Sequence, residues 1–369
     1  MSVRRGSFGF RATSLMMVAT LAVGVSSAQA AGLTWERSVA LIGSGCQTYP
    51  SPGYPGLSGV YLTRGPNGIT RGIISCPPSG YGGLPAIYWM SIDAVGRRIE
   101  RNLHVRGTSP AAAAWNGQQT TYMADWFDVG TSQDVTIWTF DDRTGASSNG
   151  GPSFETDSPQ VALIADASGW LLVYSYRGDL FQVGSMIHAF TPVQITHDGR
   201  NGDPQLVQDG NRTVLLWQHR AAGHASSSLK IATSVSHGPW QSRVFTANGA
   251  NNGNASLAAQ NGHLYVAWER DGRIVYADNT SGVWVAHTFG ARGVGPHVGA
   301  GPSPAVTWTS FSSGSLRPNR VYFAQRRVSG WTGGVAVNYL SVAEGITYDR
   351  SPAIIYWTPQ VLKMVRLAA

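Results

Sequence analysis

An all-β fold made of repeated units is what this sequence predicts, and three observations lead to that expectation. The first is a short phrase, a small or polar residue followed by proline, that recurs ahead of apolar stretches. The copies are Ser109-Pro110, Ser158-Pro159, Asp203-Pro204, Ser303-Pro304 and Ser351-Pro352, with Asn254-Ala255 filling the one gap. The second residues of these copies, at positions 110, 159, 204, 255, 304 and 352, lie 45 to 51 residues apart. This period is typical of propellers and solenoids, whose repeats bury their apolar faces against one another.

The second observation is the content of a single repeat. From Pro204 onward the chain reads PQLVQDG, RTVLLWQHR, SLKIATSV and GPWQSRVFT. Four short runs rich in Val, Ile, Trp and Thr, separated by glycine-containing turn pairs, predict four strands joined by tight turns. Beyond the N-terminus no stretch has the apolar period of a helix. Four strands per repeat favour a β-propeller over helical solenoids, whose units contain two helices.

The third observation concerns the two ends of the chain. The last repeat, from Ser351, supplies only two or three strands before the chain stops, whereas Thr34–Ile42 resembles the fourth-strand runs of other repeats. We therefore expect Thr34–Ile42 to complete the last repeat and to close the ring, which removes exposed edge strands. Four candidate strands within residues 45–106 supply one more unit. The prediction is a seven-bladed β-propeller of four-stranded antiparallel blades; if residues 45–106 form a cap, six blades remain.

One propeller domain is expected to span residues 32–369, after a leader at residues 1–31. The expected blades are residues 45–106, 107–156, 157–199, 200–248, 249–290, 300–339, and 349–369 together with 33–42.

The leader has the organisation of a secretory signal peptide. Arg4, Arg5 and Arg11 precede the apolar run LMMVATLAVGV, and small residues at Ala28 and Ala30 indicate a cleavage site shortly afterwards. About 11 apolar residues are too few to cross a bilayer roughly 30 Å thick. We expect a secreted or periplasmic bacterial protein without a membrane span.

Cys46 and Cys76 are the two cysteines of the chain. In an exported protein two cysteines most simply form one disulfide, which here closes a loop of about 30 residues and adds about 2–4 kcal/mol of stability. A metal site needs more ligands close together in sequence, so we expect neither a metal nor another cofactor.

Composition and charge narrow the partners. The chain has 45 glycines and 13 tryptophans but only 13% charged residues, and its net charge is +7. Of its 27 basic residues only Lys230 and Lys363 are lysine, and the arginines stand singly or in pairs. Without basic runs a nucleic-acid partner is not indicated. A planar guanidinium is suited to carboxylates, which favours an acidic glycan or cell-surface polysaccharide as the partner of a monomeric protein.

Three repeats end in a turn, a glycine and a tryptophan: Asp278–Trp284, Ser234–Trp240 and Ser329-Gly330-Trp331. This phrase resembles, in degenerate form, the Asp-box (BNR) repeat of sialidase-like propellers, S-x-D-x-G-x-x-W. The Asp-box is a stabilising hairpin that also occurs in lyases, lectins and other binding proteins. The resemblance implies the architecture and favours a carbohydrate ligand, and it does not imply catalysis.

The chain departs from the true sialidases of that superfamily. Those enzymes use three arginines, a tyrosine–glutamate pair and an aspartate, and have an arginine-containing F/Y-R-I-P phrase near the start, which is absent here. They also have six blades. Among the five glutamates only Glu269, in Trp268-Glu269-Arg270-Asp271, stands in a suitable loop with other polar residues. We therefore do not expect a sialidase.

A propeller usually binds its ligand at one mouth of the central channel, where loops lead into the innermost strands or join second to third strands. Aromatic faces there can stack on sugar rings while arginines and acids bind hydroxyl or carboxylate groups. The expected ligand-binding residues are Trp126, Asp128, Tyr176, Arg177, His219, Arg220, Arg270 and Arg320. The candidates for acid–base chemistry are Glu269, Asp271, His219 and Tyr348.

The candidate loops differ from blade to blade (RGD, HRAAGH, ERDG, TSFSSG), which favours one specialised site over a multivalent lectin. The leading hypothesis is a protein that binds a carbohydrate at one channel mouth. The alternatives are a glycoside hydrolase using Glu269 with Asp271 or Asp203, a polysaccharide lyase using His219, Arg220, Arg177 and Tyr348, and a protein-binding scaffold. Four tryptophans at equivalent strand ends are expected to be packing residues: Trp217, Trp268, Trp308 and Trp357.

Overall fold

The computed structural model of the chain describes most of the repeats. The described residues are 35, 39–40, 61–64, 70–76, 86–92, 98–106, 109–118, 120–128, 133–141, 147–158, 160–223, 225–246, 249–311, 318–338, 341–348, 351–357 and 362–367. Within them the only helix is one 3₁₀ turn, η2 (Ser185–Ile187), and the rest of the regular structure is β. The predicted all-β class is confirmed.

The strands within the described residues form seven four-stranded antiparallel sheets, and six of these use four strands that are consecutive in sequence. The first three are β2 (Tyr61–Arg64), β3 (Thr70–Cys76), β4 (Ala86–Ile92), β5 (Arg98–Arg106); β6 (Ser109–Trp115), β7 (Thr120–Asp128), β8 (Gln133–Asp141), β9 (Ser147–Glu155); and β10 (Ala162–Asp166), β11 (Gly169–Tyr176), β12 (Asp179–Gly184), β13 (Ala189–Gln194). The next three are β14 (Asn201–Asp209), β15 (Arg212–His219), β16 (Ser228–Val235), β17 (Gln241–Val244); β18 (Asn252–Gln260), β19 (His263–Arg270), β20 (Arg273–Asp278), β21 (Val285–Arg292); and β22 (Val294–Gly299), β23 (Ala305–Phe311), β24 (Pro318–Arg327), β25 (Gly330–Asn338).

The seventh sheet joins both ends of the chain. It has the order β1-β28-β27-β26, with β26 (Val342–Tyr348), β27 (Pro352–Trp357), β28 (Leu362–Arg366) and β1 (Val39–Ala40). Val39 lies opposite Met364 in the antiparallel pair, and Trp35 forms a further bridge to Leu367. The N-terminal strand therefore pairs with the last repeat.

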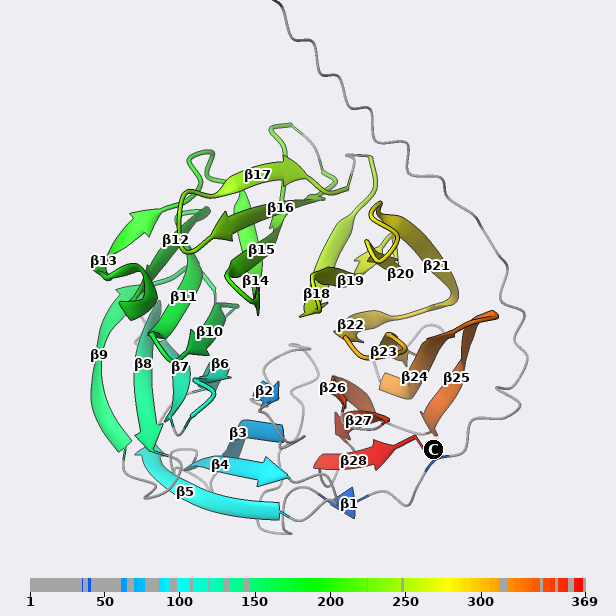
Figure 1. Cartoon of the computed structure of the whole chain (residues 1–369), viewed down its shortest axis with the longest axis horizontal. Helices are drawn as coiled ribbons and strands as arrows, with labels where there is room; N and C mark the ends of the chain where they lie inside the picture. Colours follow the sequence, from blue (N-terminus) through cyan, green and yellow to red (C-terminus); the bar gives the residue numbers. More distant parts are fainter. Residues whose placement is uncertain are drawn as a thin grey trace, which may run out of the picture.

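The sheets are arranged around a central axis, with the first strand of each consecutive set nearest the centre (Figure 1). From β2 through β6, β10, β14, β18 and β22 to β26, each innermost strand contacts the next. This is the propeller architecture that the repeats predict.

The recurrent proline phrase does not occupy one structural position, which corrects two expected blade boundaries. Pro110 and Pro204 lie in innermost strands, each beside a shift of register. Ser303-Pro304 instead precedes β23, and Pro352 is the first residue of β27; both are second strands. Proline has no N–H to donate, so the start of a strand and a bulge are the two places where a sheet tolerates it. The last two units consequently begin earlier than expected, at Val294 and Val342.

The core lies between neighbouring sheets. One cluster joins Val214 and Leu216 of β15 to Val266 and Trp268 of β19. The side chains of Trp217, Trp268 and Trp308 are at most 4% exposed, which confirms their expected packing role. The side chain of Trp357 lies outside the described part of the chain.

The tryptophan that follows each turn–glycine phrase packs against the preceding sheet. The ring centroid of Trp284 is 4.7 Å from that of Phe245, and the ring centroid of Trp331 is 4.7 Å from that of Tyr276. Trp240 reaches the preceding sheet through a 2.9 Å hydrogen bond from its Nε1 to Gln182. The Asp-box-like phrases thus tie successive sheets together.

The expected leader and Cys46 lie outside the described residues, so the signal peptide and the disulfide stay predictions; Cys76 ends β3. No helix within the described ranges is long and apolar enough to span a membrane.

Candidate functional site

Loops that join second to third strands lie on the same face as the segments that lead into the next innermost strand. The Asn201 N–H donates to the Gly178 carbonyl at 2.7 Å, and the Asn252 N–H donates to the Ser227 carbonyl at 3.2 Å. Both bonds run from the head of an innermost strand to the second-to-third loop of the preceding sheet. We call this the upper face, and the opposite one the lower face.

The upper face carries most of the predicted ligand-binding positions. Arg177, Arg220 and Arg270 lie at the upper ends of three successive sheets and are exposed, as is Arg320 near the start of β24. Trp126 and Asp128 lie at the upper end of β7, although their side chains are not described.

Tyr348 does not belong to this group. It ends the innermost strand β26 and lies opposite Pro352 at the turn into β27, which places it on the lower face. The sequence-based expectation failed because the phrase at Ser351 heads a second strand and not an innermost one. Tyr348 is therefore separated from His219 and Glu269.

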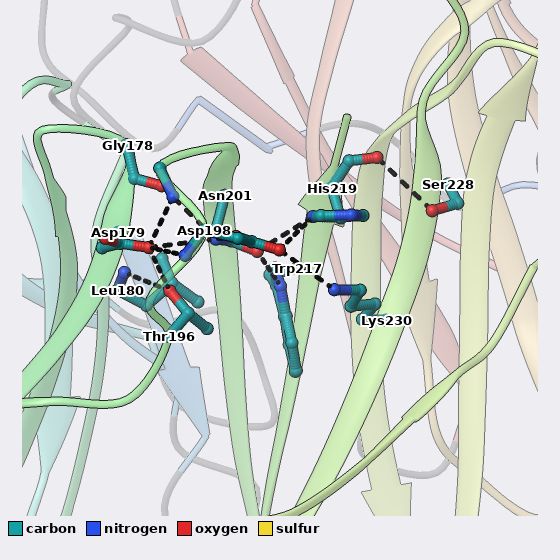
Figure 2. Close-up of polar contacts among 11 residues, drawn as sticks. Gly178, Asp179, Leu180, Thr196, Asp198, Asn201, Trp217, His219, Ser228 and Lys230 are labelled. Atoms are coloured by element: carbon teal, nitrogen blue, oxygen red, sulfur yellow. Dashed lines mark hydrogen bonds and ion pairs between the residues drawn. The ribbon is translucent and has the colours of Figure 1, made fainter. Parts of the chain in front are cut away.

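The densest polar cluster of the upper face lies between the sheets β10–β13 and β14–β17 (Figure 2). At its centre Asp198 Oδ2 lies 3.4 Å from His219 Nδ1 and 3.5 Å from Lys230 Nζ. Arg200 follows Asp198 closely in the chain and Arg220 directly follows His219, and the Arg220 N–H donates to the Arg200 carbonyl at 3.0 Å. Arg177 follows the upper end of β11 in the neighbouring sheet. We name these six residues the seam site: Arg177, Asp198, Arg200, His219, Arg220 and Lys230.

Asp179, at the start of β12, fixes the segment that carries Asp198. Its Oδ1 accepts hydrogen bonds from the N–H groups of Asp198 (3.0 Å) and Gly199 (2.9 Å) and from Thr196 Oγ1 (3.1 Å). These contacts hold the connection from one sheet to the next as a rigid support for the Asp198 carboxylate.

Asn201 links this support to the second strand of its own sheet. Its Nδ2 donates to the Asp198 carboxylate and its Oδ1 accepts from Trp217 Nε1 at 2.8 Å. The same oxygen lies 3.2 Å from His219 Nδ1. The imidazole is thus held on one side by Asn201 and Asp198.

Electrostatics keep the imidazole neutral and the carboxylate ionised. Burial lowers the pKa of His219, and the positive charges of Lys230 and Arg200 add to this, against the opposing effect of Asp198. Burial works to raise the pKa of Asp198, but the hydrogen bond from Asn201 and the positive charge of Lys230 help to bring it below its usual value.

The arginines of the upper face differ in what they contact. The Arg177 guanidinium lies 5.0 Å from the ring centroid of Tyr176, and Arg177 itself has the left-handed φ of 53° that turns it out of the strand. Within the part of the chain that the structure describes, the side chains of Arg200, Arg220 and Arg270 make no hydrogen bond or ion pair. Uncommitted guanidinium groups on an exposed face can bind an anion without first breaking another contact.

Two carboxyl groups lie nearer the central axis. Glu269 Oε1 accepts hydrogen bonds from Asn254 Nδ2 and from the Gly295 N–H, both at 2.8 Å, so it joins the sheets β18–β21 and β22–β25. Burial raises the pKa of Glu269 and also that of Asp203, on the innermost strand β14. Asp203, Asn254 and Gly295 occupy corresponding bulges of three successive innermost strands with φ of 51°, 45° and 57°.

Asp271 has a turn-capping role. It is exposed, and its Oδ1 accepts a 2.9 Å hydrogen bond from the Asn251 N–H at the head of the same sheet. Its carboxylate is therefore committed to the backbone and does not face Glu269 as an acid–base partner in a described contact. No group of three or more His, Cys, Asp or Glu side chains among the described residues is placed to hold a metal ion.

Sequence reasoning did not single out Asp198, Arg200, Asn201 and Lys230 as site residues. A repeated spacing could have identified Asn201. Asn201 lies 16 residues before Trp217 and accepts a 2.8 Å hydrogen bond from its indole N–H. In the next sheet Asn252 lies 16 residues before Trp268 and accepts the equivalent bond at 3.0 Å. A polar residue at a fixed distance before a repeat tryptophan marks the head of an innermost strand.

No protein-family model matches the sequence, and no curated protein matches it. Solved structures do match in fold. Virginiamycin B lyase from Staphylococcus aureus is 10% identical, with 92% of this chain and 100% of that chain covered and a TM-score of 0.53. A streptogramin B lyase is 12% identical, with coverages of 91% and 98% and a TM-score of 0.51.

Trypanosoma rangeli sialidase also matches, at 10% identity and a TM-score of 0.44, with 84% of this chain and 53% of that chain covered. At 10–12% identity the two lyases show a shared fold and nothing about activity. The chain is a β-propeller that is remotely similar in fold to these two lyases.

Proposed function

We propose that this protein is an exported, monomeric, seven-bladed propeller, closed by the pairing of its N-terminal strand, that binds an acidic glycan on its upper face. The observation that carries the proposal is the set of exposed arginines at the upper ends of successive sheets. Arg177 and Arg220 follow the ends of β11 and β15, Arg200 precedes β14, and Arg270 ends β19 in the next sheet. A ligand bearing carboxylates can form charge-assisted hydrogen bonds to several of them at once.

The chemistry of the site favours a saccharide over other anions. Tyr176 offers an aromatic face beside Arg177, and aromatic faces pair with the apolar face of a sugar ring. Asp203 lies on the innermost strand β14, and Glu269 lies on β19, the second strand of the next sheet. Their carboxyl groups can accept hydrogen bonds from the hydroxyl groups of a sugar. A polyanion that has no hydroxyl groups cannot donate hydrogen bonds to these two carboxyl groups, so they favour a saccharide as the ligand.

The test is a glycan array probed with the mature full-length chain and with single-alanine variants. Arg220→Ala and Arg270→Ala should each weaken binding to acidic glycans by about 1.5–3 kcal/mol, the worth of a hydrogen bond to a charged group. Arg327→Ala is the matched control, because Arg327 is an exposed arginine at the lower end of β24. That variant should bind as the unmodified chain does.

Two results would overturn the proposal. If no glycan is retained, the protein-scaffold alternative stands in its place. If Arg327→Ala weakens binding as much as Arg220→Ala, the charge of the whole molecule and not the upper face is responsible.

Export is the remaining part of the proposal, and it rests on the basic, apolar and small-residue segments of the leader. N-terminal sequencing of the protein recovered outside the cytoplasm should start just after Ala30 or Ala31. An intact Met1 on the exported protein would contradict it.

A further inference from the structure

Resting on the proposed glycan site, we propose that the seam site is also catalytic: His219 Nε2 removes the proton next to the carboxylate of a bound uronate, and the chain cleaves acidic polysaccharide by β-elimination. This goes beyond binding, because it gives the imidazole a chemical role and names the substrate class as uronate-containing glycan.

The hydrogen-bond network determines which nitrogen of His219 carries the proton. Trp217 Nε1 can only donate, so the Asn201 atom that it contacts is the amide oxygen, and the Asn201 nitrogen faces the Asp198 carboxylate. His219 Nδ1 therefore faces two acceptors, Asn201 Oδ1 at 3.2 Å and Asp198 Oδ2 at 3.4 Å. It must be the protonated nitrogen, which leaves the lone pair on Nε2.

Nε2 is not fully buried, and it has no hydrogen-bond partner among the described residues. The His219 side chain as a whole is 12% exposed. A carboxylate behind Nδ1 orients an imidazole and stabilises the imidazolium that forms when Nε2 takes a proton. Asp198 and Asn201 have this positioning role here.

The groups around the imidazole keep it in the neutral form that a base needs. Burial is the main cause that lowers the pKa of His219; the charges of Lys230 on β16 and Arg200 ahead of β14 add to it, and Asp198 opposes them. Asp179 of the neighbouring sheet belongs to the same network but is committed to backbone N–H groups. A neutral imidazole beside several cations combines a base with a site for an anion.

The reaction balances without another reactant. Arg220 or Arg177 binds the uronate carboxylate and disperses the negative charge that develops when C5 loses its proton. The C5–H electron pair forms the C4=C5 double bond, the C4–O4 bond breaks, and the proton held on Nε2 passes to the departing O4. The products are an unsaturated uronate and a shortened chain with a free hydroxyl group.

Hydrolysis is less well supported at this seam. It needs two carboxyl groups about 5 to 9.5 Å apart on either side of the bond. Asp198 is the one carboxylate of the seam site, and its oxygens are engaged by Asn201, His219 and Lys230.

The experiment follows the absorbance of the C4=C5 double bond while the mature full-length chain acts on polymers of galacturonate, mannuronate and glucuronate. Product formation is expected on at least one of them. His219→Asn keeps a donor facing Asp198 and removes Nε2, so it should lower the rate by about 100-fold or more, as loss of a general base does. Its affinity for the same polymer should stay within about twofold, since proton abstraction by a general base lowers the energy of the transition state and not that of the bound ground state. His263→Asn, at the lower end of β19, is the control and should leave the rate unchanged.

Asp198→Asn tests positioning separately. It removes the acceptor that stabilises the imidazolium, so the rate should fall and the lower limb of its pH profile should move to lower pH, with affinity changed less than the rate. A merely structural Asp198 would lower the amount of folded protein without moving the profile.

The other possible results distinguish the catalytic proposal from the glycan-binding proposal. Binding to a uronate polymer with no unsaturated product on any of the three removes the catalytic inference and leaves the glycan-binding proposal intact. If new reducing ends appear without the C4=C5 double bond, the reaction is hydrolysis and not elimination. If His219→Asn cleaves the polymer at an unchanged rate, His219 is not the base. Absence of binding and of product removes both proposals.

Discussion

Single asparagines at the heads of innermost strands stabilise two sheets at a time. Asn252 accepts a hydrogen bond from Trp268 Nε1 at 3.0 Å, and its own Nδ2 donates to the Ser227 carbonyl of the preceding sheet at 2.8 Å. Asn201 likewise accepts from Trp217 Nε1 and donates to the Gly178 carbonyl of the preceding sheet at 3.4 Å, and it also contacts Asp198 of the seam site. Side-chain amides in loops are common in any sequence, so only the repeated spacing to tryptophan distinguishes these two.

Removing the Asn252 amide should expose the dependence of Trp268 on it. Asn252→Ala leaves the buried indole N–H without an acceptor, which costs about 1–3 kcal/mol of unfolding free energy. In Asn252→Ala/Trp268→Phe the orphaned donor is gone, so the double variant should lose less than the sum of the single variants. Denaturant unfolding of all four proteins measures this, and strict additivity would contradict the account.

Glu269 should make stability depend on pH in a defined direction. Burial raises its pKa in the folded chain above the unfolded value, so the folded protein binds the proton more tightly. Stability from this group is therefore greatest in acid and falls as pH rises from the unfolded to the folded pKa. Glu269→Gln cannot titrate, so its melting temperature should rise relative to the unmodified chain across that window. If the difference in melting temperature between Glu269→Gln and the unmodified chain stays constant or shrinks as pH rises, the pKa of Glu269 is not raised by folding.

At the scale of elements, the presence of four strands in each repeat could be predicted from the sequence. Which of these strands is innermost in its sheet could not be predicted in every repeat. Alternating apolar runs and glycine turns marked the four-stranded units because these patterns follow directly from pleat and turn geometry. The proline phrase misled the assignment in the last two units, since proline suits a bulge in β14 and equally the start of β23 or β27. That one ambiguity moved Tyr348 to the wrong face.

The predicted disulfide belongs to this scale, because it would link Cys76 at the end of β3 to Cys46, which precedes β2 in the sequence. Mass spectrometry of the exported, unreduced protein should show Cys46 linked to Cys76, and reduction should lower unfolding free energy by about 2–4 kcal/mol. Two free thiols in the unreduced protein would exclude the link.

At the scale of the whole molecule, the seventh sheet depends on residues from both ends of the chain. Deleting Ser351–Ala369 removes β27 and β28, so β1 loses its partner and the edge of β26 is left open. Far-ultraviolet circular dichroism should show loss of the cooperative β-sheet unfolding transition. Deleting residues 2–31 instead, ahead of Trp35, is the control and should preserve it; a truncated chain that unfolds like the full one would refute closure.

The propeller could be predicted from sequence because the same pattern of strands and turns recurs in successive repeats. The full seam site could not be predicted, because its residues meet at one place between two sheets and do not recur. Arg177, Arg220 and His219 were found from their loops. Asp198 and Lys230 join them only through packing of two sheets, which a local pattern does not encode.

On the proposed function, the exposed arginines of the upper face bind the carboxylates of a glycan. Calorimetric titration with a uronate tetrasaccharide and with its methyl ester tests it most directly, because the two ligands differ in charge and hardly in shape. The acid should bind at least about tenfold more tightly than the ester, as expected for loss of one charge-assisted hydrogen bond. In Arg220→Ala this preference should shrink, while in Arg327→Ala it should persist. Equal affinity of the unmodified chain for acid and ester would contradict the claim.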